Sequence, residues 1–151
     1  MTSKTLQRGR DGTGSARAAA AQSHARTRHD HAQEVAEDYV ELIDDLIREG
    51  SEARGVDIAA HLGVSHVTVC KTITRLKREG LVTAEPYRAV FLTREGKRLA
   101  ERARARHTLV LAFFVALGVP ESVAEADAEG VEHHLSPATL SAMKRFLQRG
   151  R

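Results

Sequence analysis

The chain has 151 residues, of which 42% are hydrophobic and 28% are charged, as is typical of a globular protein with one core or two small ones. Its longest apolar stretch, 109–117, is too short to span a bilayer, and the N-terminus lacks the apolar centre of a secretory signal. We therefore expect a cytoplasmic protein that does not associate with membranes. The single cysteine excludes an internal disulfide and a site built from thiolates, and the absence of Trp disfavours a single-strand binder that stacks bases on aromatic rings.

Charge is distributed unevenly along the chain, although the formal net charge is only +3. Basic residues concentrate in the N-terminal tail and in segment 71–97, whereas acidic residues gather in 34–49 and 121–132. One part of the protein therefore suits a polyanion, and two parts suit cations.

Residues 1–33 are mainly Ala, Ser, Thr, Gly and Arg, with almost no large apolar side chain. This composition predicts a disordered basic arm. The arm either adds non-specific contacts to DNA phosphates or is a solvated tail, and the sequence leaves both interpretations open.

The remaining chain predicts a mainly α fold with one small β-hairpin. Apolar spacing indicates helices at 34–49, 56–62, 66–77, 94–117, 121–135 and 137–148, and two short strands at 81–84 and 89–92. Ser65, Thr93 and Ser136 are suitable N-caps. We expect one domain at 34–92, followed by a helical domain at 93–151.

A helix, a short turn with Gly63, a second helix and then a hairpin form the order of a winged helix-turn-helix. Polar and cationic side chains on the second helix lie away from its apolar face and have the reach for base edges and phosphates. The candidate DNA-binding residues are Ser65, His66, Thr68, Lys71, Thr72 and Arg75. The alternative is a small helical bundle with a solvated polar surface, but the turn, the spacing and the wing together favour DNA binding.

Two short carboxylate motifs lie outside this segment. Asp38 and Glu41 are three residues apart on the first helix, and Glu129, Glu132 and His133 occupy positions i, i+3 and i+4 on the fifth, so each set shares a face. Helix-borne ligands at such spacings can close on a metal ion. Each motif alone is weak evidence, since paired carboxylates are usually solvated, and a lone histidine such as His107 is more often a packing residue.

Taken together, these motifs resemble the manganese-responsive branch of the diphtheria-toxin-repressor family. The resemblance extends in unbroken order over 34–148, and its most specific runs are 37–41, 106–107 and 127–136. The resemblance implies a homodimeric repressor of metal-uptake genes, with a DNA-binding domain at 34–92 and a helical dimerisation and metal-sensing domain at 93–151. Its implied metal ligands are Asp38, Glu41, His107, Glu129, Glu132 and His133. Iron-responsive members have a Met- and Cys-bearing site, whereas the corresponding positions here are Asp38 and Glu129.

The chemistry of this ligand set agrees with the resemblance. Four carboxylates and two imidazoles without a thiolate suit manganese (Mn2+) or ferrous iron (Fe2+), and six ligands allow two adjacent ions per subunit. We therefore expect a manganese-dependent repressor, not an enzyme, that binds a palindromic double-stranded operator as a homodimer. Two alternatives are a metal-independent winged-helix regulator that senses a small molecule and a two-metal hydrolase, for which the chain offers no separate nucleophile or base.

Overall fold

The computed structural model describes residues 11–150. It divides into two units at Ala32, which we describe separately because their relative placement is not fixed. No helix within residues 11–150 is both long enough and apolar enough to cross a bilayer.

The first helix, α1, extends over Asp11–Arg48 and begins well before the predicted start at residue 34. The predicted disordered arm at 1–33 is therefore corrected for 11–33, which are helical, while residues 1–10 lie outside the described residues. The run Ala18–Ala21 explains the difference, because alanine has the highest intrinsic helix propensity. Low hydrophobicity predicted that this segment builds no core, and its side chains from residue 16 to 31 are indeed exposed.

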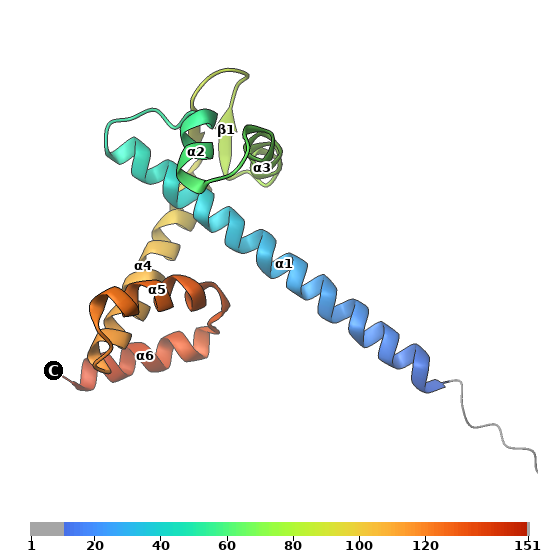
Figure 1. Ribbon diagram of the computed structural model, residues 1–151, viewed down its shortest axis with the longest axis vertical. Coiled ribbons are helices and arrows are strands. Elements are labelled where there is room, and N and C mark those ends of the chain that lie inside the picture. The colour runs from blue at the N-terminus through green and yellow to red at the C-terminus, as the bar shows by residue number, and fades with distance from the viewer. Residues whose placement is uncertain (1–10, 151) are drawn as a thin grey trace, which may run out of the picture. The chain divides into compact units, whose positions relative to one another are not determined.

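The winged helix comprises α2 (Gly55–Leu62), α3 (His66–Arg78) and the antiparallel strands β1 (Val82–Ala84) and β2 (Val90–Leu92), as Figure 1 shows. Gly63 ends α2 in the left-handed conformation with φ 64°, which glycine adopts without a steric penalty. The hydroxyl of Ser65 then caps α3 by accepting a hydrogen bond from the backbone N–H of Thr68. The predicted turn and N-cap are therefore confirmed.

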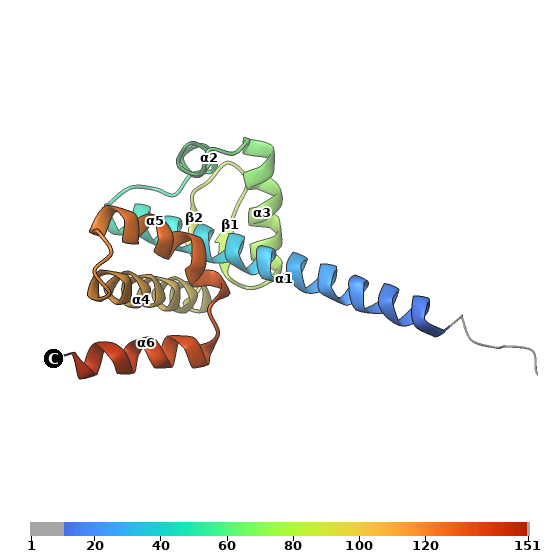
Figure 2. The same ribbon diagram turned by 60° about the horizontal axis from the view of Figure 1, so that its bottom comes forward.

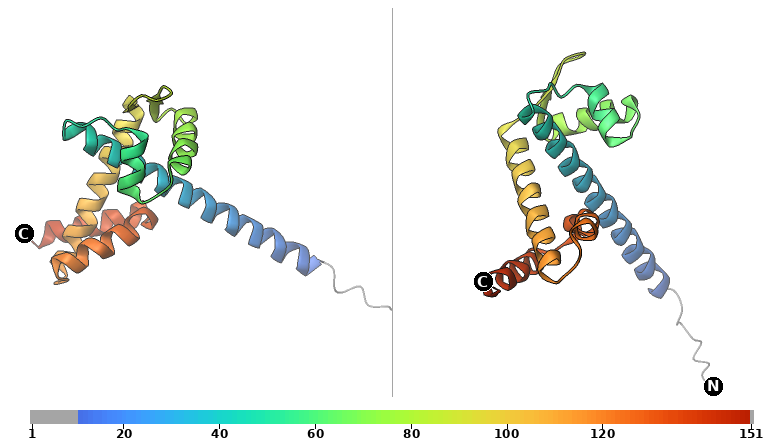
Figure 3. Two further views of the ribbon diagram at one scale, coloured as in Figure 1. Left: turned by 45° about the horizontal axis from the view of Figure 1, so that its top comes forward. Right: turned by 60° about the vertical axis from the view of Figure 1, so that its left-hand side comes forward.

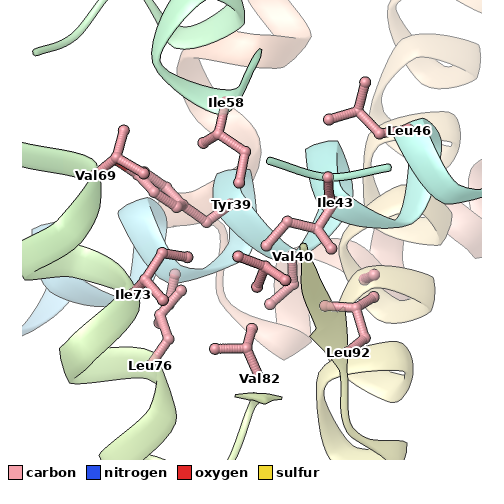
Figure 4. Packing of buried hydrophobic residues seen from close by; sticks show 14 residues of the cluster. Tyr39, Val40, Ile43, Leu46, Ile58, Val69, Ile73, Leu76, Val82 and Leu92 are labelled. Carbon is pink, nitrogen blue, oxygen red and sulfur yellow. The ribbon is translucent and has the colours of Figure 1, made fainter. Parts of the chain in front are cut away.

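A single apolar cluster joins α1 to the winged helix (Figure 4). Ile43 of α1, Ile58 of α2 and Leu76 of α3 are fully buried in it. Val82 of β1 and Leu92 of β2 are buried in it as well. Side chains of α1, α2, α3 and the wing are all buried in this one cluster. This shared packing fixes the orientation of α3 relative to α1.

The wing leads directly into α4 (Arg94–Ala116) through a close backbone approach. A Cβ atom at Gly96 would lie 2.0 Å from the carbonyl oxygen of Leu81, so only glycine fits there. Thr93 caps α4 by accepting from the N–H of Gly96, and its hydroxyl donates to the carbonyl of Gly80 at 2.6 Å. These contacts fix the start of α4 against the wing.

Helices α5 (Glu121–Val131) and α6 (Pro137–Arg149) both pack on α4, which lies between them in Figure 2. Figure 3 shows that α4 extends from the wing to this helical group. The mainly α winged-helix architecture with a helical C-terminal region is confirmed. The prediction of a regular helix to residue 135 is wrong, because α5 ends at Val131 and a 3-10 turn, η1 (Glu132–His134), follows. Ser136 caps the next helix and is extended, as the residue before Pro137 usually is, and Leu135 is extended too, so the helix cannot continue through them.

Candidate metal centre and DNA-recognition helix

The predicted metal ligands come from three elements and lie in one neighbourhood. Helix α1 contributes Asp38 and Glu41, α4 contributes His107, and the end of α5 with η1 contributes Glu129 and the pair 132–133. Because α1, α4 and α5–η1 are far apart in the sequence, the fold, and not local spacing, brings these three groups of side chains together.

His107 lies beside two carboxylates. Its Nδ1 is 2.7 Å from Oε2 of Glu132 and 3.6 Å from Oε2 of Glu129. Ligand atoms of these three residues all lie within 4.8 Å of one another, a spacing at which they could share one metal ion. His107 is therefore not a simple packing histidine.

His133 occupies the other side of Glu132. Its Nε2 is 3.6 Å from Oε1 of Glu132 and 3.5 Å from Oδ1 of Asp38. Glu132 is only 1% exposed and faces one imidazole with each oxygen. Glu132 therefore presents a ligand atom toward each of the two imidazoles.

Glu41 belongs to the same cluster electrostatically. Burial, together with the charges of Glu132, Asp38 and Glu129 and against the charge of Arg104, raises the pKa of Glu41 from 4.5 to about 7. Carboxylates that raise one another's pKa in a partly buried site form a strongly negative centre, which a bound cation would stabilise.

The pKa values of Asp38, Glu132, His107 and His133 are also raised. Burial raises the pKa of Asp38 and of Glu132, because a charged carboxylate loses hydration there. Burial alone would lower the pKa of His107, but the charge of Glu132 raises it overall. A hydrogen bond to Glu37 is the main cause of the raised pKa of His133.

Sequence reasoning missed Glu37, Arg106 and Glu125 as members of this site. Glu37 and Arg106 form a buried ion pair between α1 and α4, and Glu125 lies 3.4 Å from Nε2 of His107. The only signal for the first two was adjacency, since each immediately precedes a predicted ligand in the sequence. Arg104 adds a second tie by pairing with Asp44 and Asp45.

The candidate DNA-binding residues lie along α3 and at its N-cap, and most of them are exposed. Ser65 and Thr68 bond to each other at 2.9 Å, and Nδ1 of His66 lies 3.6 Å from Sγ of Cys70. The exposed residues are Ser65, His66, Thr68 and Lys71, whereas Thr72 and Arg75 are half-buried. The capping bond shows that Ser65 and Thr68 also have a structural role.

A groove of about 640 Å³ lies between α3 and the wing. Its lining includes His66, Cys70 and Lys77 from α3 and Tyr87 and Arg88 from the turn of the wing. The ammonium of Lys77 donates to the carbonyl of Ala84 at 2.6 Å, which holds the wing to α3. A winged helix joined to a cluster of carboxylates and imidazoles is the arrangement of a metal-responsive DNA-binding regulator.

Comparison with known proteins agrees with this class. Residues 31–90 match the family model described as "Iron dependent repressor, N-terminal DNA binding domain", and residues 93–150 match "Iron dependent repressor, metal binding and dimerisation domain". The chain belongs to the iron dependent repressor family, whose members are metal-dependent transcriptional repressors and not enzymes.

Individual relatives are transcriptional regulators. The transcriptional regulator MntR of Escherichia coli O6:H1 is 52% identical over 122 residues, which cover 81% of this chain and 79% of the relative. MntR of Salmonella typhimurium is 51% identical over 121 residues, which cover 80% and 77%.

Two solved structures have a similar fold. A manganese-dependent transcriptional repressor in complex with manganese matches with a TM-score of 0.64 and 31% identity, over 74% of this chain and 52% of the other. The manganese regulator SloR matches with a TM-score of 0.65 and 26% identity, over 75% of this chain and 53% of the other. The chain thus spans about half the length of these structural relatives.

Proposed function

We propose that this protein represses transcription in response to Mn2+ by binding an operator as a homodimer in the cytoplasm. One observation carries the proposal: carboxylates of α1 meet the imidazoles and carboxylates of α4 and α5–η1 at a single partly buried centre. The solved manganese regulators support manganese as the signal, because they match this chain with TM-scores of 0.64 and 0.65 at 31% and 26% identity.

The donor set fits manganese. Four carboxylates and two imidazoles without a thiolate suit Mn2+ or Fe2+. The proposed ligands are Asp38, Glu41, His107, Glu129, Glu132 and His133. One group of ligand atoms surrounds His107 and another surrounds His133, with Glu132 in both, which supports two ions per subunit.

Metal binding would act on DNA affinity through α1. Without a cation the charges of Glu132 and Asp38 repel the carboxylate of Glu41, which adds to the effect of burial in raising its pKa. Asp38 and Glu41 of α1 would hold a cation together with His107 of α4, and its positive charge would offset this repulsion. Because α1 shares its apolar cluster with α3, the recognition helix then has a fixed position relative to the helical domain.

The domain division supports the same mechanism. We propose a DNA-binding domain at 34–92 and a dimerisation and metal-sensing domain at 93–151, close to the ranges of the two family matches. Exposed apolar side chains of the second domain, including Val115, Leu117, Val123 and Phe146, are candidates for the dimer interface. In a two-fold dimer, the spacing of two α3 helices would match a palindromic operator.

The test is operator affinity measured against free metal concentration. A duplex selected from random sequence by the manganese-loaded protein serves as the probe, and Mn2+, Fe2+, Co2+ and Zn2+ are compared. Glu132→Gln should abolish the response to Mn2+, whereas Glu49→Gln, at an exposed position after the end of α1, should leave it unchanged. Full-affinity binding by the metal-stripped protein would instead support a metal-independent regulator.

A further inference from the structure

Glu37 is a buried carboxylate beside the cluster that is not among the proposed metal ligands. It is 3% exposed and lies on α1 next to Asp38. A charged carboxylate in such a place requires partners, because its burial carries a large loss of hydration. The partners of Glu37 indicate what it does.

The oxygens of Glu37 are already used by donors. Arg106 donates to both oxygens, at 3.4 Å from Nη1 to Oε1 and at closer range from Nη2 to Oε2, and Gln33 donates to Oε1 at 3.3 Å. The guanidinium of Arg106 pairs with both oxygens, so Glu37 is the anion of an ion pair. The guanidinium beside it repels cations, which argues against Glu37 as a metal ligand.

Glu37 instead acts on His133. Nδ1 of the imidazole lies 2.6 Å from Oε2 of Glu37. An ionised carboxylate only accepts hydrogen bonds, so a contact this short requires the proton to be on Nδ1. Arg106 Nη2 also lies 3.2 Å from Nδ1, but a protonated Nδ1 cannot accept from it. The opposite nitrogen, Nε2, then faces Asp38 and Glu132, the proposed ligands.

We propose that Glu37, held in place by Arg106, is a positioning residue that keeps the proton on Nδ1 of His133 and presents Nε2 to the metal. The inference rests on the proposed metal function and deepens it. Metal-binding histidines commonly donate their other ring N–H to a carboxylate, which fixes the tautomer and the ring orientation. Here the carboxylate is on α1 and the arginine on α4, so correct presentation of His133 requires the two helices to be packed together.

The second imidazole provides an internal comparison. His107 faces the cluster with Nδ1, and its Nε2 lies 3.4 Å from Oε1 of Glu125. The side chain of Glu125 is 59% exposed, so water competes for this longer contact. Glu125 should therefore contribute much less to metal affinity than Glu37.

The first measurement uses the unaltered protein. In protein with ¹⁵N-labelled histidine, loaded with diamagnetic Zn2+, imidazole nitrogen shifts identify which nitrogen carries the proton and which is bound to metal. The proposal predicts a protonated Nδ1 and a metal-bound Nε2 for His133. A metal-bound Nδ1 would overturn it.

The second measurement is calorimetric titration with Mn2+ of Glu37→Gln and of the double variant Glu37→Gln/Arg106→Gln. The double variant replaces the buried pair without leaving a charge unpaired, so it guards against simple misfolding. Manganese affinity should fall about 10–100-fold in both, in step with loss of the His133 Nδ1–H signature, and only slightly in Glu125→Gln. The matched control is Glu49→Gln, which should bind like wild type.

The outcomes separate this inference from the proposed function. If wild type binds Mn2+ and both Glu37 variants bind it equally well, the positioning role is wrong while the metal site stands. If wild type takes up no Mn2+, the proposed function itself fails.

Discussion

The winged-helix half and the helical half of this chain differ in how much apolar surface each one buries. The cluster that joins α1, α2, α3 and the wing contains 14 buried residues, including Ala100 of α4. The helical half buries only Val110, Ala128 and Met143 in its cluster, with partly exposed apolar neighbours around them. The first half therefore has a complete core within one chain, whereas the second gains from a partner copy, consistent with a dimerisation domain.

The proposed metal centre lies where these two halves meet. Asp38 and Glu41 come from the helix that belongs to the complete core, and His107 comes from the helix at the centre of the incomplete one. A metal ion held by both halves can make the position of the winged-helix half depend on the helical half. Each prediction below separates the contribution of one half from that of the other.

The largest expected effect is on folding of the winged-helix half. Ile43 is fully buried, so Ile43→Ala should lower the free energy of unfolding by about 2–5 kcal/mol. Met143→Ala, in the smaller cluster, should reduce it less, because neighbouring side chains there can relax into the space. Urea unfolding of the metal-free protein, at the same protein concentration for each variant, measures both losses of stability. Equal losses would mean that the two cores are equally complete.

Removal of an apolar side chain from the helical half should weaken the dimer. The ring of Phe146 is 46% exposed and packs edge-on against Phe113, with centroids 5.3 Å apart. If Phe146 is a central interface residue, Phe146→Ala should weaken dimerisation by about 2 kcal/mol, roughly 30-fold. Sedimentation equilibrium measures this. Val56→Ala, an exposed apolar change on α2, is the control, and an equal effect there would contradict the assignment.

A change on the recognition helix should weaken DNA binding without an effect on metal. Arg75 is half-buried on α3, and its Nε lies 3.9 Å from Oε1 of Glu79. Arg75→Ala should weaken operator binding by about 1–3 kcal/mol, while Mn2+ affinity of the free protein stays the same. Fluorescence anisotropy and calorimetry give the two values. Arg102→Ala, an exposed arginine paired with Glu95 on α4, should change neither.

The smallest effect is on pH dependence of stability in the metal-free protein. The pKa of Glu41 is raised from 4.5 to about 7, so between these values the folded state binds more protons than the unfolded state. The stabilisation that Glu41 contributes is fully present below its unfolded-state pKa of 4.5, and it is lost as the pH rises through its folded-state pKa of about 7. We expect a decrease on the order of 1 kcal/mol between about pH 5 and pH 8.

Glu41→Gln should flatten this decrease, and Glu49→Gln should not. Thermal unfolding across the pH range without metal measures the effect. A stability that rises over this window and is insensitive to Glu41→Gln would show that the carboxylates do not repel one another. Mn2+ should bind more tightly as pH rises, because the ligands must be deprotonated.

Local patterns in the sequence were sufficient for much of the fold. Ser65, Thr93 and Ser136 were predicted as N-caps, and each accepts the expected backbone hydrogen bond. Spacing could not show that η1 replaces the last turn of α5, since that depends on the extended residue that Pro137 imposes further along the chain. The helical segment 11–33 was missed because hydrophobicity was weighed above helix propensity.

The site was predicted in part. Shared helix faces grouped Asp38 with Glu41, and the resemblance added His107, but neither could place these residues in contact across the fold. The burial of Glu37 and its pairing with Arg106 depend on how α1 packs on α4. A single sequence carries no periodic signal for such a pair, because isolated charges usually lie at the surface.

The central claim is that metal and operator are thermodynamically linked through α1. Calorimetric titration of Mn2+ with and without a short operator duplex, at matched salt, tests it directly. Linkage is reciprocal, so a coupling of about 1–3 kcal/mol should tighten Mn2+ binding about 5–150-fold when DNA is present, and Glu41→Ala should reduce this factor. Equal manganese affinity in the two titrations would contradict the account, because the ion would then bind without any effect on the recognition helix.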